Sequence, residues 1–374
     1  MISREVLRSI EQRLSDKKAI ILLGPRQVGK TTLLKHLEKT SNLKSLWWNG
    51  DDTDVRQMLQ EPTSTKLNGL IGNAEILIID EAQRISDIGL CIKIIVDTMP
   101  NVKVIATGSS AFELANKINE PLTGRKWQYY LYPISFSEMV SHTSLLEEKR
   151  MLEHRLIYGY YPDVLNNPGD EAEIVNQLSD SYLYQDILTW GNIKRPEKLE
   201  HLVQALAFQL GNEVSYNELA KTVGLDNETV EKYIQLLEKA FIVFRLSALS
   251  RNLRNELKKS RKIYFYDNGI RNAVIKQFNP LALRNDVGAL WENFMISERK
   301  KHLEYNRIAS NQFFWRTHTQ QEIDYIEERN GTFYAYEFKW GTRRQNKFPK
   351  SFLAAYPNNE TMFVTKENYT EFVL

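Results

Sequence analysis

The stretch that most constrains this chain is the octapeptide at residues 24–31, GPRQVGKT, which fits the pattern G-x-x-x-x-G-K-[ST]. An apolar run at residues 19–23 precedes it, and a helix-like run at residues 31–37 follows it. This order predicts a strand, a glycine-rich loop and a helix. Backbone N–H groups of such a loop converge on phosphate oxygens, and the helix N-terminus adds partial positive charge. The sequence therefore predicts a phosphate-binding loop.

Two side chains of this loop have separate expected tasks. Lys30 is placed to reach the β- and γ-phosphates of a nucleoside triphosphate, and the Thr31 hydroxyl to ligate Mg²⁺. A chance match on an ordinary glycine turn is the alternative, which the correct flanking pattern disfavours. The other expected phosphate-binding residues are Gly24, Pro25, Arg26, Gln27, Val28, Gly29 and Thr32.

A second motif, EILIIDEAQ at residues 75–83, is an apolar strand that ends in two acids. The carboxyl end of a buried parallel strand lies on the ligand side of an open α/β sheet. Asp80 is therefore expected to hold Mg²⁺, and Glu81 to polarise the water that attacks the γ-phosphate. A solvated strand end would explain these acids alone, but it does not explain the two motifs together.

A further strand is expected at residues 102–107, and in such ATPases it lies between the two motif strands. Either Thr107 or Ser109 at its end is suited to sense the γ-phosphate, with a capping turn of small residues as the alternative. Arg125 follows in the sequence LTGR. Its planar cation suits developing phosphoryl charge, within its own subunit or across an oligomer interface, unless it is an ordinary surface arginine.

The segments GPRQVGKTT, IDEAQ, TGSS, LTGR and YPISFSE together resemble a large prokaryotic group of AAA+-like P-loop ATPases. The resemblance covers nearly the whole chain. It implies ATP and Mg²⁺ as ligands and a parallel α/β sheet of the additional-strand class. It also implies a winged helix after the ATPase core and a C-terminal α+β domain of restriction-endonuclease-like fold. Arg125 becomes an expected nucleotide-sensing residue through the same resemblance.

Composition narrows the protein class further. The chain has 374 residues, enough for two or three domains, and a net charge of +2, so any nucleic-acid footprint has to be local. Its one cysteine excludes an intramolecular disulfide. No apolar run approaches the roughly 18 residues that span a bilayer, and the charged N-terminus is unlike a signal peptide. We therefore expect a soluble, cytoplasmic protein without a membrane partner.

Four segments are expected along the chain: an ATPase core at 1–140, a helical lid at 141–196, a winged helix at 197–250 and a nuclease-like domain at 251–374. The recognition-position helix at residues 227–235 carries two glutamates and one lysine, so DNA binding by this helix is not the default expectation. The basic segment from Arg251 to Lys262 either follows a nucleic-acid backbone or is a solvated connection.

Acidic residues of the last segment form a pattern found in metal-dependent nucleases. Asp324 and the triplet Glu337-Phe338-Lys339 lie on two expected strands joined by an Asn-Gly hairpin turn. Asp324 and Glu337 would hold Mg²⁺, and Lys339 would orient or deprotonate the attacking water. Glu292, on an expected helix at 287–305, would be the third acid. Ordinary alternating charges on a strand face are the alternative explanation.

The leading hypothesis from the sequence is an ATPase whose nucleotide state controls a nuclease-like domain acting on nucleic acid. The alternative is a nucleotide-gated binding or signalling module whose nuclease-like domain is inactive. A homo-oligomer follows if Arg125 acts across subunits.

Overall fold

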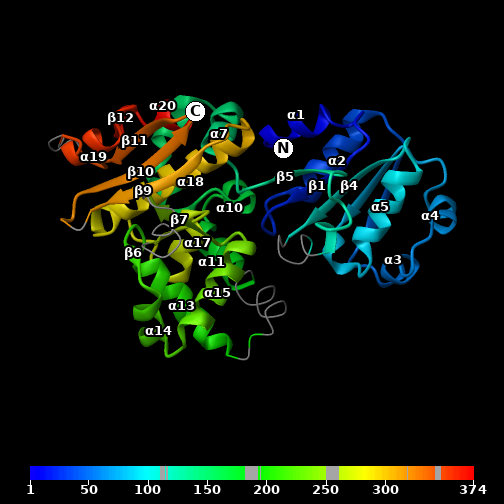
Figure 1. Cartoon of the computed structure of the whole chain (residues 1–374), viewed down its shortest axis with the longest axis horizontal. Coiled ribbons are helices and arrows are strands. Elements are labelled where there is room, and N and C mark those ends of the chain that lie inside the picture. Colours follow the sequence, from blue (N-terminus) through cyan, green and yellow to red (C-terminus); the bar gives the residue numbers. More distant parts are fainter. Residues whose placement is uncertain are drawn as a thin grey trace. The chain divides into compact units, whose positions relative to one another are not determined.

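The computed structural model describes residues 1–109, 114, 117–181, 193, 195–249, 261–317, 319–341 and 347–374. They form two compact units. The first comprises Met1–Ile134 with Lys239–Phe241, and the second comprises Ser135–Glu238 with Ile242–Leu374. Figure 1 follows the chain by colour, from the blue and cyan elements of the first unit to the green, yellow and red elements of the second.

A sheet of five parallel strands forms the centre of the first unit, in the order β2-β3-β4-β1-β5. Strand β4 pairs with both β1 and β3, so the strand expected at residues 102–107 lies between the two motif strands. This confirms a parallel α/β sheet with an added central strand. The bounds are β1 Ala19–Leu23, β2 Ser45–Asn49, β3 Ile76–Asp80, β4 Lys103–Gly108 and β5 Lys126–Tyr130.

The three central strands of this sheet are buried along their full length. Continuous apolar sequences produce this burial, because a parallel strand between helical layers has both faces away from water. The first described helices of this unit are α1 Glu5–Glu11, α2 Lys30–Ser41, α3 Thr53–Met58, α4 Ser64–Ile71 and α5 Ile88–Thr98, and a short 3-10 turn, η1, spans Ala82–Arg84.

The second unit is built on a mixed sheet of seven strands, in the order β12-β11-β10-β9-β7-β8-β6. Strand β11 runs parallel to β12, and β7 runs parallel to β9, whereas the other neighbours are antiparallel. The bounds are β6 Glu213–Val214, β7 Val243–Ala248, β8 Arg261–Phe265, β9 Asn311–Arg316, β10 Glu322–Arg329, β11 Thr332–Phe338 and β12 Asn359–Val364.

The segment expected as a winged helix contains three helices and strands of a three-stranded ladder. Strand β6 lies between α13 (Pro196–Phe208) and α14 (Tyr216–Val223), and α15 (Asn227–Lys239) precedes β7 and β8. The Ser215 side chain accepts a hydrogen bond from the backbone N–H of Glu218, as its capping spacing predicts. Both β6 and β7 pair with β8.

The expected boundary after residue 250 does not separate two sheets. Ser247 and Ala248 of β7 lie in register with Phe313 and Phe314 of β9, so the ladder of β6, β8 and β7 continues into the C-terminal strands. Periodicity within β7 cannot reveal this partner, because the partner lies far along the chain. Residues 251–260 of the basic segment lie outside the described residues.

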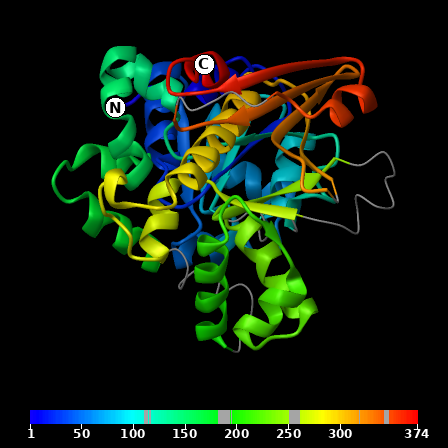
Figure 2. The ribbon, with the colours of Figure 1, turned by 90° about the vertical axis from the view of Figure 1, so that its left-hand side faces the viewer.

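The C-terminal elements follow the order helix, three strands, helix, strand. Helix α18 (Val287–Tyr305) precedes β9, β10 and β11, and α19 (Lys350–Ala355) precedes β12. Figure 2 shows the long yellow helix α18 lying along the orange strands. The turn between β10 and β11 has positive φ at Asn330 (50°) and Gly331 (80°), which is the hairpin geometry that the Asn-Gly pair predicts. The short helix α20 (Thr370–Val373) ends the chain.

The helices between residues 136 and 181 belong to the second unit. Asn272 of helix α17 (Asn268–Val274) donates to the carbonyls of Leu156 and Ile157, at 3.1 and 2.8 Å. The segment expected as a helical lid therefore packs on α17. Residues 182–192 and 194 lie outside the described residues. The bounds are α7 Phe136–His142, α8 Leu145–Arg150, α9 Leu152–Tyr158, α10 Pro162–Asn166 and α11 Glu171–Ser181.

Candidate functional site

The predicted phosphate-binding loop connects β1 to the N-terminus of α2. A Cβ atom on Gly24 would lie 2.0 Å from the carbonyl oxygen of Leu131, so only glycine fits there. Gly29 has φ 92°, in the left-handed region that favours glycine. These two glycines let the backbone turn tightly into the twelve-residue helix α2, whose N-terminus is suited to an anion.

Lys30 lies within the curve of its own loop. Its side chain is buried, and its Nζ donates to the carbonyls of Gly24 and Pro25, at 2.8 and 2.7 Å. The ammonium group is therefore held over the loop backbone. Arg4, the residue before α1, supports the loop, because its guanidinium donates to the carbonyl of Val28 at 2.6 Å.

The two predicted magnesium ligands meet directly. Thr31 donates its hydroxyl hydrogen to Oδ2 of Asp80 at 2.7 Å. The other carboxylate oxygen of Asp80 accepts from the hydroxyl of Thr107 and from the backbone N–H of Glu81. A hydroxyl and a carboxylate side by side at the loop are hard oxygen donors, so they fit Mg²⁺. Thr107, one of the two sensor candidates, thus fixes Asp80.

Ser109, the other sensor candidate, lies beside Glu81. Gln83 donates from its amide to Oε2 of Glu81 at 2.5 Å and to Oγ of Ser109 at 3.0 Å. Sequence reasoning missed Gln83, although it belongs to the IDEAQ motif. Its side chain is 1% exposed, and its amide oxygen has no hydrogen-bond partner among the described residues. The Glu81 carboxylate is therefore oriented by a buried amide.

Arg125 lies at the end of the strands opposite to the phosphate-binding loop. Its carbonyl accepts a hydrogen bond from Ala19, the first residue of β1, whereas the phosphate-binding loop follows the last residue of that strand. Its guanidinium forms a 2.7 Å ion pair with Asp97. This position argues against an action of Arg125 on the loop of its own subunit, because the full length of β1 separates them. The expected role across a subunit interface and an ordinary surface arginine are the two alternatives left.

The structure brings the predicted C-terminal acids together. Tyr325 pairs with Tyr336 across the hairpin, which places Asp324 beside Glu337. Lys339 lies just beyond the end of β11, and its Nζ donates to Oε2 of Glu337 at 2.9 Å. Oδ2 of Asp324 accepts from the backbone N–H of Phe338 at 2.8 Å.

Electrostatic coupling joins these acids to Glu292 on α18. Burial raises the pKa of Glu292 to about 7, and the Asp324 carboxylate adds to the rise. Burial and Asp324 also raise the pKa of Glu337 to about 7. The pKa of Asp324 itself is raised, mainly by burial. We name Glu292, Glu322, Asp324 and Glu337, with Lys262 and Lys339, the acid cluster.

The prediction that the basic segment is solvated or follows a nucleic-acid backbone is wrong for Lys262. It is 1% exposed, and its Nζ lies 3.1 Å from Oε1 of Glu292 and 2.5 Å from Oε1 of Glu322. It therefore cannot follow a nucleic-acid backbone, because its charge is already buried against two carboxylates. Arg261, its neighbour, pairs with Glu231 at 3.7 Å. Sequence reasoning missed the contributions of Lys262 and Glu322 to the acid cluster, since they depend on contacts between distant segments.

In the described part of the chain, no group of three or more His, Cys, Asp or Glu side chains is arranged to hold a metal ion. Asp324 and Glu337 are nevertheless neighbouring carboxylates, and carboxylate oxygens suit Mg²⁺. They fit a metal as a pair. The described residues also include no helix long and apolar enough to span a membrane.

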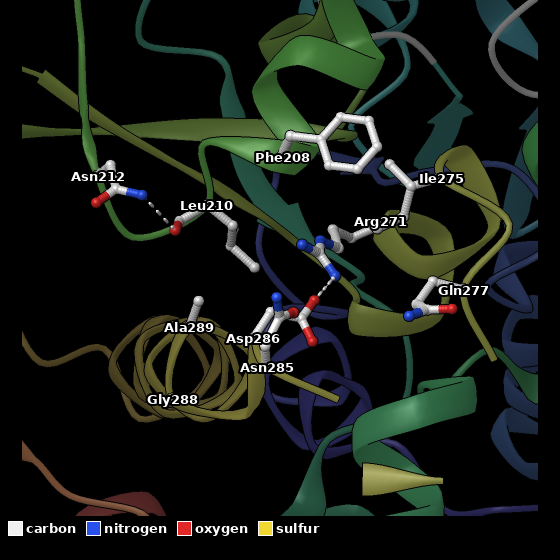
Figure 3. A pocket seen from close by; sticks show the side chains of 10 residues that line it. All are labelled: Phe208, Leu210, Asn212, Arg271, Ile275, Gln277, Asn285, Asp286, Gly288 and Ala289. Atoms are coloured by element: carbon white, nitrogen blue, oxygen red, sulfur yellow. Dashed lines mark hydrogen bonds and ion pairs between the residues drawn. The ribbon is translucent and has the colours of Figure 1, made fainter. Parts of the chain in front are cut away.

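A separate cavity of about 620 Å³ lies in the second unit (Figure 3). Arg271 and Asp286 form an ion pair at its wall, with a distance of 2.5 Å. Ala207 and Asn272 take the other hydrogen bonds of the Arg271 guanidinium. The guanidinium of Arg271 therefore has protein partners for its hydrogen bonds. The lining residues are Phe208, Leu210, Asn212, Arg271, Ile275, Gln277, Asn285, Asp286, Gly288 and Ala289.

Comparison with known protein families agrees with the geometry of the first unit. Residues 16–140 match the family described as an AAA domain. The chain therefore carries a P-loop ATPase domain of the AAA class. Two domains of unknown function follow it: DUF8612 matches residues 149–281, and DUF4143 matches residues 287–372.

Other proteins are similar to this chain in sequence over much of its length. An uncharacterized protein of Mycobacterium tuberculosis is 26% identical over 340 residues, which covers 90% of this chain and 73% of that protein. An uncharacterized protein of Haemophilus influenzae is 26% identical over 302 residues, covering 74% of each. The solved structure of the Walker-type ATPase paby2304 of Pyrococcus abyssi is similar with a TM-score of 0.50 and 16% identity, covering 74% of this chain and 96% of that one. This last likeness shows a common fold.

Proposed function

We propose that the chain is a cytoplasmic, Mg²⁺-dependent ATPase whose nucleotide state controls a nuclease-like C-terminal region acting on nucleic acid. The contact between Thr31 and Asp80, beside the buried Lys30, is the observation that carries the ATPase. Lys30 and the loop N–H groups bind the phosphates, and Thr31 and Asp80 hold Mg²⁺. The bound ion supplies positive charge that neutralises the developing phosphoryl charge.

Glu81 is proposed to orient the attacking water and take its proton. Gln83 and Ser109 hold the Glu81 carboxylate by hydrogen bonds, so its direction does not depend on solvent. The backbone of Glu81 has φ 48°, an unusual conformation for a non-glycine residue that costs on the order of 1 kcal/mol. Ser109 is the proposed γ-phosphate sensor, since it lies next to the catalytic glutamate.

Arg125 is proposed to complete the site of a neighbouring subunit. Its side chain is 39% exposed, and Asp97 directs it along the surface, so it is available to a second copy of the chain. An arginine supplied across an interface stabilises phosphoryl charge in the transition state. The active ATPase would then be a homo-oligomer.

The C-terminal elements support the nuclease-like part of the proposal. Helix α18, strands β9, β10 and β11, helix α19 and strand β12 combine a mixed sheet with helices, which is compatible with the proposed α+β nuclease-like region. Asp324 and Glu337 would hold a divalent metal, and Lys339 would orient the attacking water. Glu292 is the third acid. The nucleic-acid contact would include the segment from Arg251 onward, without Lys262.

A second candidate is a nucleotide-gated binding module whose nuclease-like region does not cleave. The bond of Lys262 to Glu292 and Glu322 favours this candidate, because an ammonium group occupies carboxylates that could otherwise bind metal. In this case the second unit serves as an interaction surface.

Incubation of the full chain with single- and double-stranded DNA and RNA separates the two candidates. Mg²⁺ or Mn²⁺ is present, with and without ATP, and Glu337→Ala and Lys30→Ala are tested in parallel. Cleavage that is lost in Glu337→Ala and altered by ATP or by Lys30→Ala would support the ATP-controlled nuclease. ATP-dependent retention of nucleic acid without cleavage would support the binding module.

A further inference from the structure

Lys262 lies in the acid cluster as a metal ion would lie, between carboxylates from separate elements. It extends from β8, whereas Glu292 lies on α18 and Glu322 at the start of β10. One Nζ atom contacts an oxygen of each, at 3.1 and 2.5 Å. Coordination of two carboxylates by one cation is the arrangement that a divalent ion would otherwise provide.

The surroundings of Lys262 keep its ammonium group in this place. The ring of Phe314 lies 5.5 Å from Nζ and closes one side by a cation–π contact. The Tyr264 hydroxyl donates to the same Glu292 oxygen that Lys262 contacts, at 2.5 Å. The Lys262 side chain is only 1% exposed, so water does not hydrate its ammonium group. Without the two carboxylates, the charge would be buried and unpaired, which is costly.

The other cation of the cluster is placed differently. Lys339 is 38% exposed and contacts Glu337 alone among the acids within ion-pair distance in the described residues. The pair Glu292 and Glu322 is thus filled by a buried ammonium group. The pair Asp324 and Glu337 faces a lysine that can move into solvent.

We propose that Lys262 is a built-in cation, which takes the place of a metal ion between Glu292 and Glu322 and leaves only Asp324 and Glu337 open to a divalent ion. This inference rests on the proposed metal-binding role of Asp324 and Glu337. It makes Lys262 a positioning residue and gives the cluster one metal position instead of two.

Lys262 belongs to the domain of residues 149–281, whereas all the acids of the cluster belong to the domain of residues 287–372. Strand β8 carries Lys262, and β8 pairs with β6 and β7 of the winged helix. The acid cluster is therefore incomplete without the winged helix.

Counting bound Mn²⁺ tests the proposal. The full chain is used without nucleotide, in an Asp80→Asn background that removes the metal position at the phosphate-binding loop. Lys262→Met is compared with the unchanged cluster by equilibrium dialysis and calorimetry. The matched control is Lys339→Met, which removes the same charge from beside Asp324 and Glu337. We expect one Mn²⁺ per chain for the unchanged cluster and for Lys339→Met, and two for Lys262→Met.

Equal numbers of Mn²⁺ for the unchanged cluster and Lys262→Met would overturn the role of Lys262. If that equal number is one, the proposed metal binding by Asp324 and Glu337 still stands. No ion in the unchanged cluster but one in Lys262→Met would support the role of Lys262 and overturn metal binding by Asp324 and Glu337. If Lys262→Met folds poorly, the increase in melting temperature on addition of Mn²⁺ is measured instead. We expect a larger increase for Lys262→Met than for the unchanged cluster, and equal increases count against the proposal.

Discussion

Thr31 and Asp80, which lie 49 positions apart in the sequence, are joined by a 2.7 Å hydrogen bond. The bond links the helix that follows the phosphate-binding loop to the end of the neighbouring motif strand. The hydroxyl and the carboxylate proposed to hold Mg²⁺ are therefore already side by side before any ligand binds. Pre-organisation of this kind lowers the free-energy cost of binding.

Lys30→Ala should abolish ATP binding or turnover. Lys30 is the cation held inside the loop, and its loss should lower the rate of hydrolysis roughly 10²-fold or more. Phosphate release and binding of a fluorescent ATP analogue measure both effects. Lys35→Ala, an exposed lysine of the same helix, is the control. Full turnover by Lys30→Ala would contradict the assignment.

Gln83→Ala should lower kcat while leaving the Kd for ATP nearly unchanged. The substitution removes the amide that holds Glu81 and Ser109, but it removes no group expected to touch the phosphates. Glu81→Gln, which keeps the shape but loses the base, should bind ATP and hydrolyse it far more slowly. Steady-state kinetics and calorimetry separate the two constants. A Gln83→Ala variant with unchanged kcat would show that the orientation of Glu81 is set elsewhere.

Arg4→Ala should weaken both folding and ATP binding. It leaves the carbonyls of Val28 and Tyr132 without the guanidinium, at a cost of about 1–3 kcal/mol for each buried group. The loop loses support at Val28, so the Kd for ATP should rise. Arg8→Ala, at an exposed position of the following helix α1, is the matched control for melting temperature and Kd. Identical behaviour of the two variants would argue against a role of Arg4 in the loop.

Arg125→Ala should lower ATP hydrolysis roughly 10³-fold without loss of ATP binding, if the residue acts across subunits. Mixing this variant with Lys30→Ala should restore part of the activity. In such a mixed oligomer, an intact loop of one chain meets the intact Arg125 of the other. Mixed oligomers that form but remain inactive would exclude the proposed role.

Asp286→Asn should destabilise the protein by about 3 kcal/mol, because Arg271 and Arg284 lose their shared partner. Burial opposes ionisation of Asp286, but hydrogen bonds from Arg284 and Arg271 lower its pKa to about 2. The stabilisation is therefore complete above the unfolded-state pKa of about 4 and is lost as the pH falls through about 2.

Urea unfolding of the wild type and Asp286→Asn at pH 7 and pH 3 measures this effect. The difference in the free energy of unfolding should be smaller at pH 3. Glu360→Gln, at an exposed carboxylate of the same unit, should show almost no difference at either pH. A constant difference for Asp286→Asn would mean that lost packing, and not lost charge, destabilises the variant.

Local patterns were sufficient to predict the elements that carry the ATPase site. The loop at Gly24–Thr31 and the buried strand before Asp80 agree with the structure. Their signals are short runs of apolar residues, glycines and acids, which act through nearby backbone geometry. The hairpin at Asn330 and Gly331 was predicted for the same reason.

Contacts between distant segments were not predictable in the same way. Lys262 belonged to a basic run by composition, but β8 turns it toward Glu292 on α18. Whether a lysine is solvated or buried depends on what the fold places beside it. Gln83 is a similar case, since its importance follows from the meeting of β3 and β4 ends. The packing of α9 against α17 also has no local signature in either helix.

The pairing of β7 with β9 has a consequence for how this protein can be divided. A polypeptide that starts at residue 287 would retain the acids Glu292, Asp324 and Glu337 but would leave one side of β9 without its hydrogen-bonding neighbour. An uncovered strand edge is a template for intermolecular pairing and aggregation. The matches to DUF8612 and DUF4143 therefore mark sequence segments that share one sheet, and inheritance or transfer of the second without the first would require a new way to protect that edge.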